Sequence, residues 1–189
     1  MDSHYPPPDF AASIYEGVFE VAREKVGDGL HDIVNSRATF VDDDVLRVLQ
    51  AVVSWKTEKG IPLNRPDAMV AANASLHMAV NSSGFRKYFE TPAGDDWFHI
   101  RDILSLGDDV SAATAFTNVL ELFPDCEPSR FTASRQDQID LIDETHPDID
   151  VFNSHDRIRH PMNYPSDDTL FKSLLALPDQ PYLPPPNMR

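Results

Sequence analysis

Apolar residues recur along this chain at the three- and four-residue spacing that is typical of amphipathic helices. Seven stretches show the pattern, and the last two are predicted over 134–145 and 167–177. The inward positions predicted for the seven are Phe10, Ile14, Val18 and Val21; Val45, Leu46, Leu49, Val52 and Val53; Met69, Leu76 and Val80; Trp97, Ile100 and Leu104; Phe116, Val119, Leu120 and Phe123; Ile139, Ile142 and His146; and Leu170, Phe171, Leu174 and Leu175.

Polar and helix-breaking residues fall where these helices should begin and end. The run Asp42–Asp44 is expected to cap the second helix, since carboxylates favour the positive end of the helix dipole. Pro66 is expected in the first turn of the third helix. Gly107 should end the fourth helix, Asp108-Asp109 should cap the fifth, and Pro124 should stop it.

The remaining patterns favour an all-α fold. Alternating β-branched residues are scarce, and no Asn-Gly or Asp-Gly pair stands between alternating apolar runs. Prolines cluster near the two ends of the sequence. We therefore expect a compact single domain of several helices over 10–177, with an extended Pro-rich arm at 1–9 and a Pro-rich tail at 178–189.

Composition narrows the class of protein. The 189 residues are 41% hydrophobic and 25% charged, which is typical of a globular chain. A net charge of −15 argues against direct nucleic-acid binding. No apolar run is long enough for a membrane span, and residues 1–8 do not resemble a secretory signal. The single Cys126 fits a reducing compartment, so we expect a cytoplasmic protein.

The negative charge is concentrated rather than spread evenly. Residues 95–150 hold 14 acidic and 3 basic side chains. Within them, Asp137, Asp140 and Glu144 share one face of the predicted helix 134–145, while its apolar stripe lies on the opposite side. Two interpretations stay open for this acidic face: a solvated surface, or a surface whose charge repulsion a cationic partner relieves.

The segment 81–89 combines turn-forming and aromatic residues. Asn81 and Gly84 accept turn conformations, and Phe85, Tyr88 and Phe89 then follow at helical spacing. We expect these rings to pack in the core rather than to take part in catalysis.

This segment resembles a motif of the bacterial DNA-mimic protein family of the nineteen-kilodalton type. In that family an Asn-x-Gly-Phe-x-x-Phe/Tyr-Phe segment follows a helix, then a Gly-Asp step, then a helix pair that ends in Leu-Phe-Pro. The chain is similar over about 66–176. The matching residues are Asn81, Gly84, Phe85, Tyr88, Phe89, Gly94, Asp95, Trp97, Leu122, Phe123 and Pro124. Ser82-Ser83-Gly84 departs from the family's tighter turn, and 153–165 lacks its late acidic stretch.

The resemblance implies an all-helical, usually dimeric protein whose acidic surfaces stand in for DNA phosphates. The implied partner is a basic DNA-binding protein, either histone-like or a helix-turn-helix repressor. On this hypothesis the protein has no catalytic residue, cofactor or metal. The carboxylates predicted to bind the partner are Asp102, Asp108, Asp109, Asp125, Glu127, Asp137, Asp140, Asp143, Glu144, Asp148 and Asp150.

Two other functions stay open. An immunity-type protein that neutralises a basic effector, such as a nuclease, would use the same acidic surface. A metal-dependent hydrolase would need a site built from His146, His155, Asp156 and His160, although their spacing does not match the helical His-Glu-x-x-His pair. Neither a Gly-x-Ser-x-Gly elbow nor a phosphate-binding Walker loop occurs in the sequence.

Overall fold

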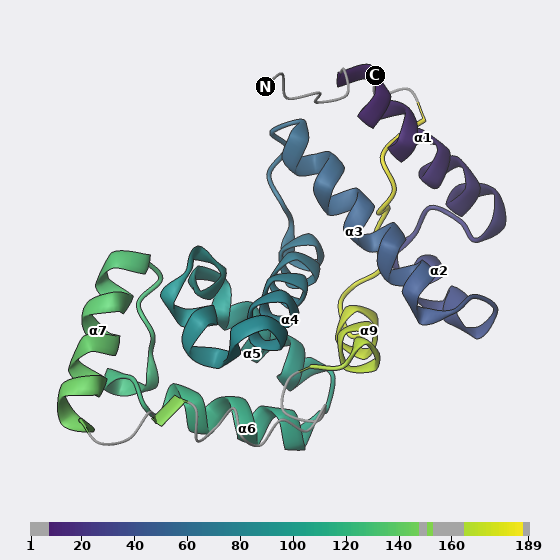
Figure 1. Ribbon diagram of the computed structural model, residues 1–189. Coiled ribbons are helices and arrows are strands. Elements are labelled where there is room, and N and C mark those ends of the chain that lie inside the picture. The colour runs from purple at the N-terminus through teal and green to yellow at the C-terminus, as the bar shows by residue number, and fades with distance from the viewer. Residues whose placement is uncertain (1–7, 148–150, 153–164, 187–189) are drawn as a thin grey trace. The chain divides into compact units, whose positions relative to one another are not determined.

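The computed structural model describes residues 8–147, 151–152 and 165–186, and in this part of the chain the fold is all-α (Figure 1). The prediction of the fold class is therefore confirmed. The helices are α1 (Pro8–Lys25), α2 (Leu30–Asn35), η1 (Ser36–Ala38), α3 (Asp42–Glu58), α4 (Arg65–Glu90), η2 (Pro92–Asp96), α5 (Trp97–Leu106), α6 (Val110–Leu120), η3 (Pro124–Cys126), α7 (Thr132–Thr145) and α9 (Asp167–Leu175).

Contacts divide the chain into two compact units. Unit 1 comprises residues 1–67 and 177–189, and unit 2 comprises residues 68–176. The two units are defined by their internal contacts, which do not decide whether they fold as one domain. The single domain expected over 10–177 therefore stays a prediction.

Unit 1 packs α1 and α2 against α3. Phe19 and Trp55 meet edge to face with their ring centroids 6.3 Å apart, and Leu30, Leu49 and Val52 are also buried in this unit. The predicted stripe on α1 is wrong at Val21, whose side chain is 51% exposed. The helix is rotated so that Phe19 and Ala22 face the interior instead. The side chains of Phe10 and Ile14 lie outside the described residues.

The start of α3 differs from the expected cap. Val41 is the N-cap residue and accepts no side-chain hydrogen bond, so the prediction that the Asp42–Asp44 run caps the helix is wrong. The three carboxylates instead occupy the first turn, where they face the positive end of the helix dipole. Their expected electrostatic role therefore holds, although the capping hydrogen bond is absent.

The C-terminal segment of unit 1 is extended and packed. The backbone amide of Leu30 donates to the carbonyl oxygen of Gln180, and the backbone amide of Tyr182 donates to the carbonyl oxygen of Asp28. Tyr182 and Leu183 are buried. Burial, followed by the neighbouring carboxylate of Asp67, raises the pKa of the Tyr182 hydroxyl well above its usual value. The Pro-rich tail predicted at 178–189 therefore contributes two side chains to the core of unit 1.

Unit 2 is built around an aromatic cluster. A kink at Gly84, where φ is +82°, interrupts α4 and redirects the segment that carries Phe85 and Phe89. The Phe89 ring lies 4.8 Å from Phe123 and 6.4 Å from Phe116. Because Gly84 sits in the left-handed range that side chains disfavour, the predicted turn chemistry at this position is confirmed.

Helices α5, α6 and α9 complete the core of unit 2. Both α6 and α9 pack on α5, and an added Cβ at Gly107 would lie only 2.4 Å from the carbonyl oxygen of Thr169. Gly107 therefore ends α5, as predicted, and also permits the close approach of α9. Asp109 is the N-cap of α6, with its carboxylate accepting from the amide of Ala112.

Candidate protein-interaction surface

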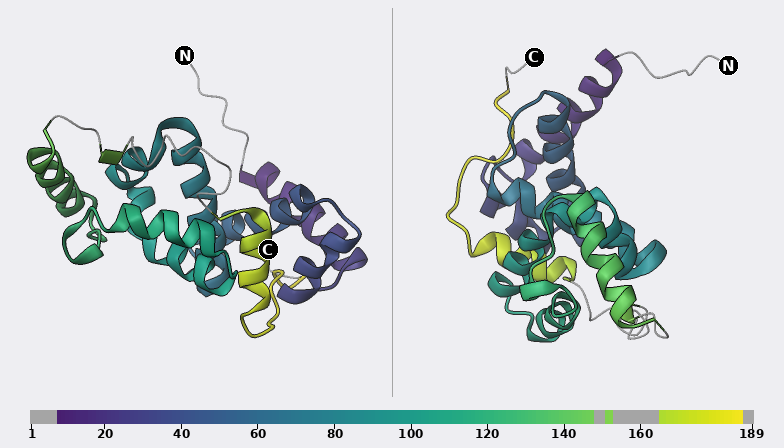
Figure 2. Two further views of the ribbon diagram at one scale, coloured as in Figure 1. Left: turned by 90° about the horizontal axis from the view of Figure 1, so that it is seen from below. Right: turned by 90° about the vertical axis from the view of Figure 1, so that its left-hand side faces the viewer.

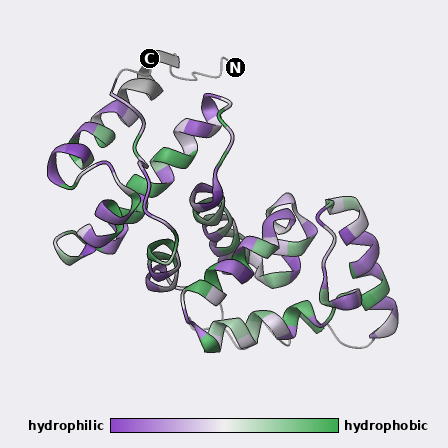
Figure 3. Ribbon diagram, turned by 180° about the vertical axis from the view of Figure 1, so that it is seen from behind, coloured by the Kyte–Doolittle hydropathy of each residue, from purple (hydrophilic) through white to green (hydrophobic). Residues whose placement is uncertain are grey.

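Helix α7 carries the predicted acidic face and lies at the edge of unit 2 in Figure 1 and in the left view of Figure 2. Its residues alternate between hydrophilic and hydrophobic along the ribbon (Figure 3). Ile139 and Ile142 are buried, as the apolar stripe predicted. His146 was predicted on the same side but is exposed, because the helix ends at Thr145 and His146 takes a non-helical conformation as the C-cap.

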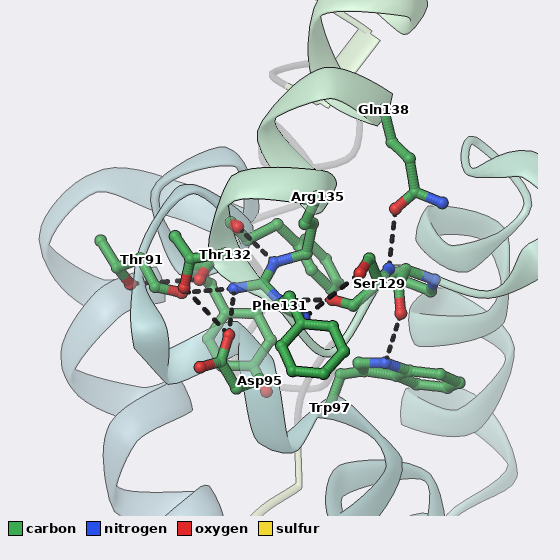
Figure 4. A network of polar contacts seen from close by, with 11 residues as sticks. Thr91, Asp95, Trp97, Ser129, Phe131, Thr132, Arg135 and Gln138 are labelled. Carbon is green, nitrogen blue, oxygen red and sulfur yellow. Dashed lines mark hydrogen bonds and ion pairs between the residues drawn. The ribbon is translucent and has the colours of Figure 1, made fainter.

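A buried arginine fixes the first turn of α7 (Figure 4). The side chain of Arg135 is fully buried. Its guanidinium donates to the carbonyl oxygens of Phe89 at 2.5 Å, Ser129 at 2.5 Å and Thr91 at 2.7 Å, and to Oδ1 of Asp95 at 2.7 Å. Four acceptors around one cation are what its burial requires, because an unpaired buried charge is costly.

The segment before α7 is held by the same network. The amide of Ser129 donates to Oε1 of Gln138 at 2.7 Å, and Nε2 of Gln138 donates to the carbonyl of Glu127. Nε1 of Trp97 donates to the carbonyl of Pro128 (Figure 4 shows the first and third of these bonds). These bonds lay residues 127–129 along α7, so the backbone of Glu127 is beside the acidic helix.

A second arginine joins α7 to α4. The guanidinium of Arg86 binds both carboxylate oxygens of Asp143, at 2.9 and 2.6 Å, and also Oε1 of Glu90 at 2.8 Å. The hydrogen bonds from Arg86 lower the pKa of the Asp143 carboxyl, and those to Asp143 raise the pKa of Arg86. Asp143 therefore contributes less free negative charge to the surface than its neighbours on α7.

The other three carboxylates of α7 face solvent. Asp137, Asp140 and Glu144 are exposed, as the helical spacing predicted. Within the described part of the chain, none of the three takes part in an ion pair, and Asp140 accepts one hydrogen bond from Gln136. Leu141, 50% exposed, stands between Asp137 and Glu144 on the same face. The exposed side of α7 is thus a row of unpaired carboxylates with one apolar side chain among them.

The other predicted carboxylates occupy different parts of unit 2. Asp125 and Glu127 are exposed near the C-terminal end of α6. Asp108 is exposed just before α6, and Asp109 is engaged in capping and accepts from Oγ1 of Thr169 at 2.8 Å. The two groups are separated by the length of α6, about 16 Å for its 11 residues.

The remaining predicted carboxylates are half-buried or lie outside the described residues, and one exposed carboxylate was not predicted. Asp102 is half-buried on α5. Asp148 and Asp150 lie outside the described residues. The exposed carboxylate of Glu121 was missed, because it directly follows the core residue Leu120 at the end of a predicted helix. Sequence spacing alone gave no reason to join it to the surface.

The histidine site is only partly described. His146 is exposed and its Nδ1 lies 3.0 Å from Oγ1 of Thr145. His155, Asp156 and His160 lie outside the described residues. Over the described ranges, no group of three or more His, Cys, Asp or Glu side chains could hold a metal ion. The hydrolase alternative gains no support from the side chains that are placed.

A family model described as DMP19-like protein matches residues 62–174, which is more than half of the chain. The chain belongs to the DMP19-like family. This confirms the resemblance to the DNA-mimic family, with boundaries close to those expected. Comparison with curated proteins gave no match, and comparison with solved structures gave none either.

The residues of the DMP19-like motif have packing roles in the structure. Phe85, Tyr88 and Phe89 are buried, as predicted. An added Cβ at Gly94 would lie 2.9 Å from the carbonyl oxygen of Tyr88 and 3.0 Å from Nε of Arg135. The Gly-Asp step of the motif therefore gives Arg135 both room and a carboxylate. The motif shapes the interior on which α7 rests rather than the exposed face of α7.

Unit 2 contains most of the DMP19-like match, and it is also the more acidic unit. By sequence it holds 18 acidic and 8 basic residues, a net charge of −10. No helix in the described ranges is long and apolar enough to cross a membrane.

Proposed function

We propose that this DMP19-like protein is a non-enzymatic DNA mimic that acts in the bacterial cytoplasm, as a homodimer. Its exposed carboxylates bind the DNA-binding face of a basic protein, either histone-like or a helix-turn-helix repressor. The single observation that carries the proposal is the row Asp137, Asp140 and Glu144, which is exposed and outside any ion pair among the described residues.

The charge of unit 2 supports this proposal. Neighbouring carboxylates on a helix lie roughly 5–6 Å apart, a spacing of the same order as that of successive phosphates along a DNA strand. The two arginines that contact or belong to α7 do not neutralise the row, because Arg86 is bound to Asp143 and Glu90 and Arg135 is buried. A cationic partner would relieve the repulsion within the row and would be steered toward it.

Exposed apolar side chains also occur on α7 and directly before it. Phe131 is the N-cap residue of α7 and is 76% exposed, and Leu141 stands within the carboxylate row. A folded protein partner can cover such side chains, whereas counterions cannot. We propose that Asp125 and Glu127 belong to this surface, and that Asp102, Asp108 and Asp109 lie toward its margin. Asp148 and Asp150, which lie outside the described residues, remain predicted partner-binding carboxylates.

The test is binding to two purified probes, a bacterial histone-like protein and a helix-turn-helix repressor, measured by titration calorimetry. We expect a complex with at least one probe that weakens steeply between about 50 and 200 mM salt and that duplex DNA displaces. The charge-reversal variant Asp140→Lys/Glu144→Lys should lose this binding and keep its helical circular dichroism.

The matched control reverses two charges with the same spacing in unit 1. Glu16 and Glu20 are exposed on α1, four residues apart, like Asp140 and Glu144 on α7. The variant Glu16→Lys/Glu20→Lys has the same net charge as the α7 variant. If both variants lose binding equally, net charge rather than the α7 face is responsible, and the proposed surface is wrong.

A purified basic nuclease serves as a third probe, because an immunity-type protein would use the same carboxylates. Inhibition of the nuclease together with no binding to either DNA-binding probe would replace the DNA-mimic proposal with nuclease neutralisation. No complex with any of the three would overturn both.

A further inference from the structure

Unit 1 contains an apolar groove between α1, α2 and α3. Its volume is about 530 Å³, within the range of about 300–1,000 Å³ that is typical of small-molecule sites. The apolar side chains of its walls come from all three helices and from the turn before α3. They are Val18, Val21, Ala22, Val26, Ile33, Phe40, Val45 and Val48.

Two features of α1 leave this groove open. The side chain of Val21 is half-exposed, although the hydrophobic pattern placed it in the core. Gly17 lines the same wall, and a Cβ added there would meet no atom within 4 Å. An apolar chain entering the groove would therefore find exposed valine surface and unfilled space beside the helix backbone.

The charged residues that line the groove are cationic in balance. They are Lys25, Arg47 and Asp44, a net charge of +1. Unit 1 as a whole has 13 acidic and 8 basic residues, a net charge of −5. Arg47 and Asp44 are paired across 3.6 Å at the surface, and Lys25 has no ion pair within the described ranges. The groove therefore offers an unneutralised ammonium group beside an apolar wall.

We propose that this groove binds a single-chain amphipathic anion, of the class of fatty carboxylates. The hydrocarbon chain lies along Val18, Val21 and Val48, and burial of its methylene groups supplies the favourable free energy. The carboxylate lies at the rim, paired with Lys25. The flexible stem of this lysine can follow the apolar wall while its charge remains in water. The groove is lined entirely by residues outside the DMP19-like match over 62–174.

The experiment titrates the full-length protein with decanoate and with decyltrimethylammonium, both below their micelle concentrations, by calorimetry. The two probes have the same chain and opposite charges. A protein of net charge −15 attracts the cation through its general field. Saturable one-to-one binding of decanoate, tighter than that of the cation, is therefore expected only if a cationic apolar site exists. Absence of saturable decanoate binding, or tighter binding of the cation, would overturn the proposal.

Variants locate the site. Gly17→Leu places a side chain in the open space of the groove and should weaken decanoate binding by about tenfold or more, since packed interiors exclude a second occupant. Thr57→Leu adds the same side chain at an exposed position of α3 outside the groove and should bind like the parent. Equal affinity of Gly17→Leu and the parent would place the ligand elsewhere.

The proposed pairing of the ligand's carboxylate with Lys25 is tested separately, by a substitution at the surface that should leave the fold intact. Lys25→Gln should weaken decanoate binding by about two- to fivefold, as expected for one exposed ion pair, and should leave the cation unaffected or slightly favoured. Lys59→Gln removes an exposed charge that does not line the groove and is the matched control. If Lys25→Gln and Lys59→Gln behave alike, Lys25 does not hold the carboxylate.

Discussion

Arg135 in unit 2 and Lys56 in unit 1 are both cations inside a helical unit, but their partners differ. Arg135 is fully buried and donates to three backbone carbonyls and one carboxylate. Lys56 is 14% exposed and donates to Oδ2 of Asp67, a fully buried carboxylate, at 2.6 Å. In unit 2 the charged group of Arg135 thus binds mainly backbone carbonyls, whereas in unit 1 Lys56 forms an ion pair with one carboxylate, that of Asp67.

The difference indicates what each cation organises. The carbonyls bound by Arg135 belong to Phe89, Thr91 and Ser129, so the arginine ties the end of α4 and the segment before α7 to α7 itself. Lys56 lies 5.4 Å from the centroid of the Tyr182 ring, so its pair with Asp67 lies under the C-terminal segment. One cation positions the acidic helix, and the other supports the packing of an extended tail.

The largest effect is expected from Arg135→Met. The substitution leaves three carbonyl acceptors without their donor and removes the partner of Asp95, so we expect a loss of about 3–5 kcal/mol in the free energy of unfolding. Urea denaturation followed by circular dichroism measures it. Arg101→Met removes an exposed arginine that lies over Trp97 and is the control, with an expected loss below about 1 kcal/mol. Equal losses in both variants would contradict the network's role.

Lys56→Met is the corresponding change in unit 1. It leaves the carboxylate of Asp67 buried with only the amide of Asn64 as a donor to Oδ2. We expect a loss of about 3 kcal/mol, and partial recovery in Lys56→Met/Asp67→Leu, because that variant no longer buries an unpaired charge. The measurement is the same urea titration, with Lys59→Met, at an exposed lysine three residues further along the chain, as the control. A double variant no more stable than the single one would show that packing, not charge, dominates.

The pair of Arg86 and Asp143 should give a smaller, pH-dependent effect. Its hydrogen bonds lower the pKa of Asp143 in the folded protein. The stabilisation is therefore fully present above the ordinary carboxyl pKa of about 4 and is lost as the pH falls through that value toward the lowered one. Since the Asp143 side chain is 43% exposed, we expect at most about 1 kcal/mol.

The variant Asp143→Asn isolates this contribution. Stabilities of the parent and of Asp143→Asn, measured by urea denaturation between about pH 5 and pH 2, should differ at the upper pH and converge at the lower. A constant difference across this range would mean that the asparagine acts through packing and that the ion pair contributes nothing.

The sequence predicted the helices and the exposed acidic face well because both depend on local spacing. The faces of α7 follow from the positions of Ile139, Ile142 and the three carboxylates, and the structure places them accordingly. Burial of Arg135 was missed, because an arginine between Ser134 and Gln136 has the composition of a surface position. Its place four residues before Ile139, on the apolar side, was the available signal.

Features that depend on contacts distant in the sequence were harder to predict. The ion pair of Asp143 joins residues 57 positions apart, and Asp109 bonds to Thr169 across 60. The local pattern predicted that Asp109 caps a helix, but it gave no sign of the bond of Asp109 to Thr169 or of the ion pair of Asp143 with Arg86. Likewise, the rotation of α1 that exposes Val21 depends on the packing of Phe19 against Trp55.

The smallest expected effect on stability is also the one that separates folding from function most clearly. In Asp140→Asn/Glu144→Gln, two exposed carboxylates four residues apart become neutral amides of nearly the same shape. Because like charges at this spacing repel, the variant should be more stable than the parent by a few tenths of a kcal/mol. The urea midpoint measures this gain, and added salt should diminish it, since salt already screens the parent.

Loss of probe binding in this more stable variant would show that the chain retains a repulsive face for the sake of its partner, as expected where function costs stability. Glu16→Gln/Glu20→Gln, with the same spacing on α1, should gain comparable stability and keep binding. If the α7 variant binds both DNA-binding probes as tightly as the parent, the carboxylate row only solvates α7. The excess negative charge of unit 2 would then not bind a partner through α7.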